Sequence, residues 1–156
     1  MNVEMVQFKR ILIPTDFSPA AWNAINMAID MCCGEKASIT LLHVYPSSAK
    51  FDNRTKSLDS ELNSDLKGLE QRMTTFSREL SKGKDLEIDS VILSGWVDEE
   101  ILSFIQKNDF DLVIMGINSN GLDNRPGSHI TQMIEKTSTP LMVIPNNQTK
   151  TAFTIK

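Results

Sequence analysis

Short apolar runs recur along the chain and are separated by amphipathic or polar stretches. The runs are "KRILIPT" at 9–15, "ASITLLHVYP" at 37–46, "LEIDSVILSG" at 86–95, "FDLVIMG" at 110–116 and "PLMVIP" at 140–145. The second run is nearly continuous in apolar residues, which is typical of a parallel strand covered on both faces. The pattern therefore predicts five strands.

Helix signals occupy the first interval, "DFSPAAWNAINMAIDMCCG". Ser18 suits the N-cap, Pro19 the first helical position and Gly34 the position just after the helix. Apolar residues then recur every three or four positions, which predicts one buried face. That expected face consists of Trp22, Ile25, Ile29 and Cys32.

A longer helix is predicted from Leu58 to about "SKGK" at 81–84. Its apolar stripe has helical spacing and is typical of core packing rather than of a coiled-coil partner surface. The stripe consists of Leu58, Leu62, Leu66, Leu69, Met73, Phe76 and Leu80. Asp98 is expected to cap a short helix through Ile101, Leu102 and Ile105, and a last helix is expected at 128–138.

Strands and helices alternate throughout, with connections long enough for crossover helices. This alternation predicts an α/β fold with a mainly parallel sheet and helices on both faces. No internal repeat or linker interrupts it, so we expect one domain over residues 1–146. In the polar tail at 147–156, "AFTI" is either an extra edge strand or an unpaired end.

Composition narrows the class of partner. The chain has 156 residues, a formal net charge of −4 and a pI near 5.2. Phosphate backbones and anionic lipids select basic surfaces, so nucleic acid and membrane are disfavoured as main partners. No run approaches the roughly 20 apolar residues of a membrane span. The start of the chain lacks the order of a signal peptide, so a cytoplasmic protein is predicted.

The two cysteines, Cys32 and Cys33, are adjacent at a predicted helix end. Neighbouring cysteines form a disulfide only with strain, and no metal ligands stand near them. Two small core-packing thiols are therefore favoured over a redox switch.

Candidate chemistry gathers where the predicted strands end. Ligands of such sheets bind beyond the carboxyl ends of the strands, at the point where strand order reverses. Thr15 and Asp16 follow the first strand, His43 lies near the end of the second, and Gly95 ends the third. Each also has an ordinary structural interpretation: Asp16 as a turn residue, and His43 as a core histidine.

The loop after the fourth strand, "MGINSNGLDNRPGS" at 115–128, is the most suggestive stretch. Gly127 and Ser128 stand at a helix start, where free N–H groups and the helix dipole favour an anion. Gly116 would let the chain leave its strand close to a ligand. Asn118 is a further hydrogen-bond donor, and His129 falls on the first helical turn, either near the anion or facing solvent.

Better-known phosphate loops do not match. There is no G-x-x-x-x-G-K-[ST], no G-x-G-x-x-G and no G-x-S-x-G, which disfavours P-loop enzymes, dehydrogenases and common hydrolases. A receiver domain is another possibility for this architecture, but it would need an acidic cluster beyond the first and third strands. The third strand ends "LSGW", without an acidic residue.

Taken together, these stretches resemble the universal stress protein (UspA-type) family. The resemblance is carried by "KRILIPTDFSPAAWNAINMAIDM", "ITLLHVYP", "SGWVDEEIL", "DFDLVIMG" and "GSHITQMIEKTSTPLMVIP", and it covers residues 8–145. Each motif alone is weak, but their order and spacing are jointly specific.

The resemblance implies an open five-stranded parallel sheet of Rossmann-like, adenine nucleotide alpha hydrolase-like type. It also implies a homodimer joined through the last strands and a role in stress survival. Many members bind ATP through a loop written G-x2-G-x9-G-[S/T], and Mg²⁺ would accompany that ATP. By resemblance, the nucleotide would be bound by Pro14, Thr15, Asp16, Val44, Gly116, Asn118, Gly127, Ser128, His129 and Ile130. In this set, Asp16 would hold the ribose side and Val44 would lie beside the adenine.

The loop departs from that pattern. Ser119 stands where the second glycine is expected, and seven residues instead of nine separate it from Gly127. Three hypotheses follow: a stress regulator that binds ATP or a related adenine nucleotide, a dimeric protein-interaction module without nucleotide, and a phosphoryl- or adenylyl-transfer enzyme. The third is the weakest, because the loop offers no base or catalytic lysine and hydrolysis would be slow. No catalytic residue is therefore assigned.

Overall fold

The structure is a computed structural model that describes residues 7–32, 35–46, 58–117 and 128–146, with backbone alone at 46, 58–63 and 128–129. Its strands are β1 (Arg10–Pro14), β2 (Ala37–Pro46), β3 (Leu86–Gly95), β4 (Leu112–Ile117) and β5 (Leu141–Pro145). Its helices are α1 (Pro19–Met31), α2 (Leu58–Ser81), α3 (Val97–Lys107) and α4 (Ser128–Lys136). The predicted alternation is confirmed. Gly34 and the tail at 147–156, for which an edge strand and an unpaired end are both open, lie outside the described residues.

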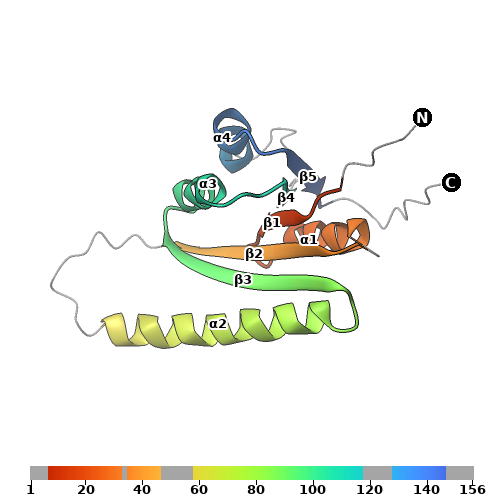
Figure 1. Ribbon diagram of the computed structural model, residues 1–156. Helices are drawn as coiled ribbons and strands as arrows, with labels where there is room; N and C mark the ends of the chain where they lie inside the picture. The colour runs from red at the N-terminus through yellow and green to blue at the C-terminus, as the bar shows by residue number, and fades with distance from the viewer. Residues whose placement is uncertain (1–6, 33–34, 47–57, 118–127, 147–156) are drawn as a thin grey trace, which may run out of the picture.

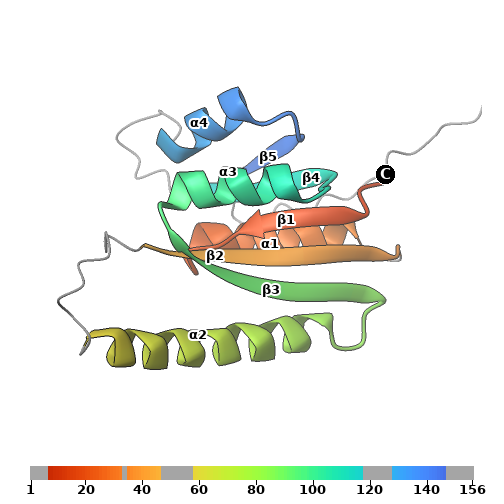
Figure 2. The same ribbon diagram turned by 60° about the vertical axis from the view of Figure 1, so that its left-hand side comes forward.

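The five strands form one parallel sheet in the order β3-β2-β1-β4-β5. The chain moves outward from β1 to β3 and then returns across β1 to β4 and β5. Because parallel crossovers share one hand, this reversal puts α1 and α2 on one face and α3 and α4 on the other. Figures 1 and 2 show α2 along β3, with α3 and α4 on the opposite side of the sheet. The predicted α/β architecture is confirmed.

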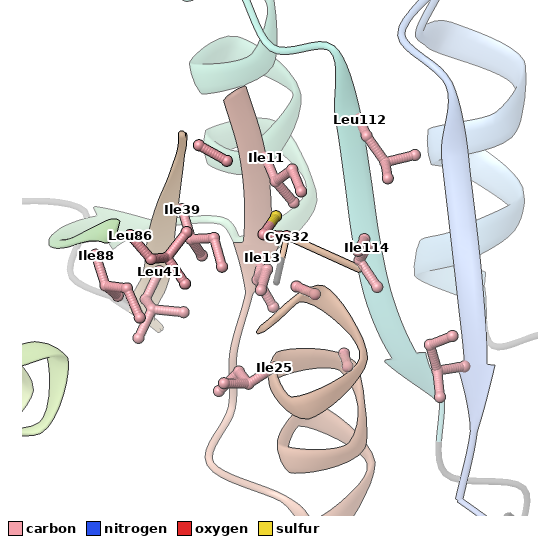
Figure 3. Close-up of a cluster of buried hydrophobic side chains, with 14 of the residues drawn as sticks. Ile11, Ile13, Ile25, Cys32, Ile39, Leu41, Leu86, Ile88, Leu112 and Ile114 are labelled. Carbon is pink, nitrogen blue, oxygen red and sulfur yellow. The ribbon is translucent and has the colours of Figure 1, made fainter. Parts of the chain in front are cut away.

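Alanines let α1 pack closely on its face of the sheet. Helix α1 begins as predicted: the Ser18 hydroxyl accepts a hydrogen bond from the Ala21 N–H at 3.2 Å, and Pro19 opens the first turn. Its buried residues are Ala20, Ala21, Ala24, Ile25 and Ala28. Figure 3 shows Ile25 of α1 near Ile13 of β1, with Ile114 of β4 alongside.

The predicted burial of Trp22 is wrong. Its side chain is 42% exposed and meets the edge of the Phe76 ring on α2, with ring centroids 5.0 Å apart. An indole cannot fit beneath a helix that lies this close to the sheet, so the alanines take the inner face. Cys32 does pack in the core as expected, and burial raises the pKa of its thiol. Cys33 lies outside the described residues.

The long helix α2 packs as predicted over its described part. Met73 is fully buried, and Leu66, Leu69, Phe76 and Leu80 are half-buried. The side chains of Leu58 and Leu62 lie outside the described residues. Core packing therefore accounts for the C-terminal half of the stripe.

The opposite face has its own core, built from β1, β2 and β4 against α3 and α4. Its buried members are Leu12, Leu42, Val44, Ile101, Leu102, Ile105, Val113, Met115, Ile130 and Met133. The predicted cap of α3 is wrong: Trp96 holds the N-cap position, and Asp98 lies inside the first turn. There its negative charge still suits the positive end of the helix dipole.

The fourth strand and the last helix differ from their predicted bounds. Strand β4 begins at Leu112 rather than at residue 110, because the Asp111 carboxylate accepts the backbone N–H groups of Lys9 and Arg10, both at 2.9 Å. Phe110 instead packs against Phe104. Helix α4 ends at Lys136 rather than at residue 138. No described helix combines the length and apolar character needed to cross a bilayer.

Candidate functional site

A cavity lies where the strand order reverses. Strands β1 and β4 are neighbours in the sheet, yet helices α1 and α4, which come after them in the chain, lie on opposite faces, and this opens a crevice at the carboxyl ends of the two strands. The cavity there has a volume of about 350 Å³. That volume is within the usual range for small-molecule sites.

Most of the cavity wall is apolar and belongs to the core shared with α3 and α4. The apolar lining consists of Pro14, Ala21, Leu42, Val44, Val97, Ile101, Met115, Ile117 and Ile130. The remaining lining residues are Thr15, Asp16, His43 and Gly116. An apolar slot with a few polar groups at one side suits a flat, weakly polar ring joined to a polar substituent.

The polar side is the turn that joins β1 to α1. Thr15 is buried, and its N–H donates to the Leu42 carbonyl at 2.8 Å. Its hydroxyl accepts the Phe17 N–H at 3.1 Å, while Asp16 Oδ1 accepts the Ser18 N–H at 2.9 Å. Asp16 is exposed, and its Oδ2 has no partner among the described residues. One carboxylate oxygen thus holds the turn, and the other is available to a ligand.

Two further features fix this turn. Phe17 has a φ of 62°, a left-handed backbone conformation that is unusual for a bulky residue. Its ring lies against His43, with centroids 4.8 Å apart. His43 Nδ1 lies 2.8 Å from the Thr15 carbonyl oxygen, so a side chain of β2 is hydrogen-bonded to the turn.

The sequence comparison agrees with this geometry. The sequence model of the universal stress protein family matches residues 7–145, nearly the whole chain. The chain belongs to the universal stress protein family.

Individual relatives have the same fold. Universal stress protein MJ0577 of Methanocaldococcus jannaschii is 25% identical, over 89% of this chain and 96% of its own length. Universal stress protein UspA from Lactobacillus plantarum gives a TM-score of 0.72 at 20% identity, covering 90% of this chain and 99% of that one. A universal stress protein family protein from Arabidopsis thaliana, solved with AMP bound, gives 0.59 at 16% identity over 89% and 92% of the two chains. The shared fold is the adenine nucleotide alpha hydrolase-like type.

The cavity brings together six of the residues that the family resemblance nominated. They are Pro14, Thr15, Asp16, Val44, Gly116 and Ile130. Ser128 and His129 form the start of α4 beside Ile130, although nothing is described of their side chains. Asn118 and Gly127 lie outside the described residues. Gly95, which ends β3, is not part of the cavity lining.

The structure supplies a packing reason for Gly116, beside the expected approach to a ligand. This residue lies within β4 rather than at its exit, and a Cβ built on it would come 2.1 Å from the Ala20 carbonyl oxygen. The missing side chain therefore lets the backbone of α1 cross β4. Close approach to a ligand is not needed to explain this glycine.

The sequence pattern does not single out most of the apolar wall. Leu42, Val97, Ile101 and Met115 occupy ordinary core positions of strands and helices, so their pattern carries no separate signal. His43 is not among the residues that the family resemblance nominates, although a histidine at the end of an otherwise apolar strand is a usable signal. Within the described ranges, no three His, Cys, Asp or Glu side chains are grouped to hold a metal ion.

Proposed function

We propose that this universal stress protein binds an adenine nucleotide in the cavity at the β1/β4 switch point. The observation that supports the proposal most is the pairing of an apolar slot with the uncommitted Asp16 oxygen at its polar side. The Arabidopsis relative with AMP bound supports the same ligand class.

In this proposal, each part of the nucleotide has a partner. Val44, Ile101 and Met115 offer apolar surface to the base. Asp16 Oδ2 is an acceptor for a ribose hydroxyl. The amino end of α4 begins at Ser128, next to the lining residue Ile130, and unpaired N–H groups there attract a phosphate.

A more specific version of the proposal is that the ligand is ATP together with Mg²⁺. It depends on the loop at 118–127, which departs from the family's spacing at Ser119 and lies outside the described residues. Adenosine and its first phosphate require only the described cavity and the start of α4. Titration with AMP, with ATP alone and with ATP plus Mg²⁺ separates the two forms.

The decisive measurement is calorimetric titration of the purified chain with AMP and ATP. Asp16→Ala is expected to weaken binding about tenfold or more, because a ribose hydroxyl loses a charged acceptor. Asp65→Ala is the matched control, since Asp65 is an exposed carboxylate on α2 away from the cavity. Absence of saturable binding to the wild-type chain would overturn the proposal.

The wider role proposed is regulation in the cytoplasmic stress response, as a homodimer paired through β5. Among the described strands, β5 has one neighbour, β4. The Pro140 carbonyl accepts a hydrogen bond from the Val113 N–H, and the Asn146 N–H donates to the Ile117 carbonyl. The backbone N–H and C=O groups of the even-numbered residues of β5 therefore point toward β4. The N–H of Val143 therefore points to the free edge, where a second copy would pair.

This register gives a selective test of the dimer. Val143→Pro removes an outward N–H without removing a bond to β4, and it is expected to shift sedimentation from dimer to monomer. Val143→Thr keeps the N–H and is expected to remain dimeric. A wild-type chain that sediments as a monomer at micromolar concentration would refute pairing through β5.

A second function, protein interaction without nucleotide, is favoured by one observation. Large apolar side chains are exposed on several elements: Phe17, Trp22, Trp96 and Ile134. Nucleotide retained by the chain after purification from cells, detected by mass spectrometry, would count against this alternative.

A further inference from the structure

We propose that His43 is a positioning residue of the nucleotide site, and this inference rests on the function proposed above. His43 would act through Thr15 and Phe17, by fixing the turn that presents Asp16 to the ligand. Three observations carry the inference: the 2.8 Å contact of His43 Nδ1 with the Thr15 carbonyl, the ring contact with Phe17, and the unusual φ of Phe17.

The contact with Thr15 determines the tautomer of His43. A carbonyl oxygen only accepts hydrogen bonds, so Nδ1 must carry the proton and donate it. In the neutral ring, Nε2 is then the unprotonated nitrogen. The turn thus receives a donor from a neighbouring strand, and that donor comes from a side chain rather than from the sheet ladder.

The ring contact between His43 and Phe17 helps to hold Phe17 in its strained backbone conformation. A left-handed conformation in a bulky residue has an energetic cost and persists only where its surroundings impose it. The Phe17 N–H is held by the Thr15 hydroxyl, and its ring is held by the imidazole. Phe17 directly follows Asp16. The direction of the Asp16 side chain therefore depends on both contacts of Phe17, the hydrogen bond to Thr15 and the ring contact with His43.

Two substitutions separate the hydrogen bond from the bulk of the ring. His43→Leu fills the volume without a donor and is expected to raise the Kd for AMP about fivefold to tenfold, the effect of one lost hydrogen bond. His43→Asn restores an N–H donor close to the position of Nδ1 and is expected to bind AMP within about twofold of the wild type. Urea unfolding of each variant checks that it is folded under the titration conditions.

A spectroscopic readout tests the tautomer directly. Long-range ¹H–¹⁵N correlation spectra of the free chain in alkaline buffer should show a neutral imidazole protonated at Nδ1. The chain contains 2 histidines, so the signals lost in His43→Asn belong to His43. The common Nε2–H tautomer at His43 would overturn the inference.

The outcomes distinguish this inference from the proposed function. If the wild-type chain binds no AMP, the proposed function fails and the positioning role fails with it. If the wild-type chain binds AMP and folded His43→Leu binds equally well, the inference alone fails. If His43→Asn is as weak as His43→Leu, the donor to Thr15 is not what positions Asp16, and the inference is again overturned.

Discussion

The two faces of the sheet are packed by different means, although the same strands supply both. On one face, the alanines of α1 lie against β1 and β4, and the helix backbone crosses directly over Gly116. On the other, branched and long side chains such as Leu42, Val44 and Met115 meet α3 and α4. The cavity of about 350 Å³ at the carboxyl ends of the strands has most of its wall on this second face.

This difference shows how one sheet provides both a close-packed face and a face with an open cavity. Small residues bring α1 close to the sheet and leave no room for a side chain at Gly116. Larger side chains fill most of the interface with α3 and α4, and the cavity at that interface opens beside the Asp16 turn. We therefore expect added volume to be costly on the α1 face and tolerated at the cavity.

The largest effect is expected from Gly116→Ala. The new methyl group would overlap the backbone of α1 at Ala20, which a side-chain rotation cannot relieve. We expect a loss of about 1–3 kcal/mol or more in the free energy of unfolding, measured by urea denaturation.

Gly68→Ala is the matched control for that substitution. Gly68 lies within α2, and a Cβ built there has nothing within 4 Å among the described residues. Replacing a helical glycine in open space should stabilise the chain by about 0.5–1 kcal/mol. Equal unfolding free energies for Gly116→Ala and the wild type would refute the close-packed interpretation of the α1 face.

A smaller effect on stability but a clear effect on binding is expected from Val44→Phe. The larger phenylalanine side chain can occupy the cavity. The unfolding free energy should therefore change by less than about 1.5 kcal/mol. Nucleotide binding should weaken about tenfold or more, because the ring occupies the slot proposed for the base.

Val113→Phe provides the contrast on the same face. Val113 is fully buried and does not line the cavity, so the same added volume should cost about 1–3 kcal/mol. If both phenylalanine variants were equally destabilised, the cavity would not be the open space that the comparison requires.

The smallest effect is expected from Ser77→Ala on α2. The Ser77 hydroxyl is buried and has no hydrogen-bond partner within the described part of the chain. Removing it should stabilise the fold by about 1 kcal/mol in urea denaturation. Ser81→Ala, which changes an exposed hydroxyl, should stay within about 0.5 kcal/mol of the wild type. Destabilisation by Ser77→Ala would indicate that this hydroxyl has a structural partner.

The fold could be predicted from local patterns, because the spacing of apolar residues in strands and in helices can be read from neighbouring positions of the sequence. Strands β2 and β3 have their predicted bounds, and Ser18 caps α1 as expected. The errors occur where packing overrides pattern. Helical spacing alone placed Trp22 inside, but the closeness of α1 to the sheet puts it outside.

The candidate site was predicted only in part, and its polar residues were easier to find. Asp16 and Thr15 follow a strand in a position where polar groups are informative. Ile101 and Met115 look like core residues in the sequence, since an apolar side chain has the same pattern whether it meets another side chain or a ligand. Whether the nominated residues bind nucleotide stays a prediction.

The sequence by itself determined the α/β class, the parallel strands and the family, because hydrophobic periodicity, caps and motif order are local properties. Tertiary structure alone decided which face of the sheet is close-packed, why residue 116 is glycine, and how His43 reaches the Thr15 carbonyl. Those features depend on contacts between residues far apart in the chain, and no local pattern encodes the distance between a helix and a sheet.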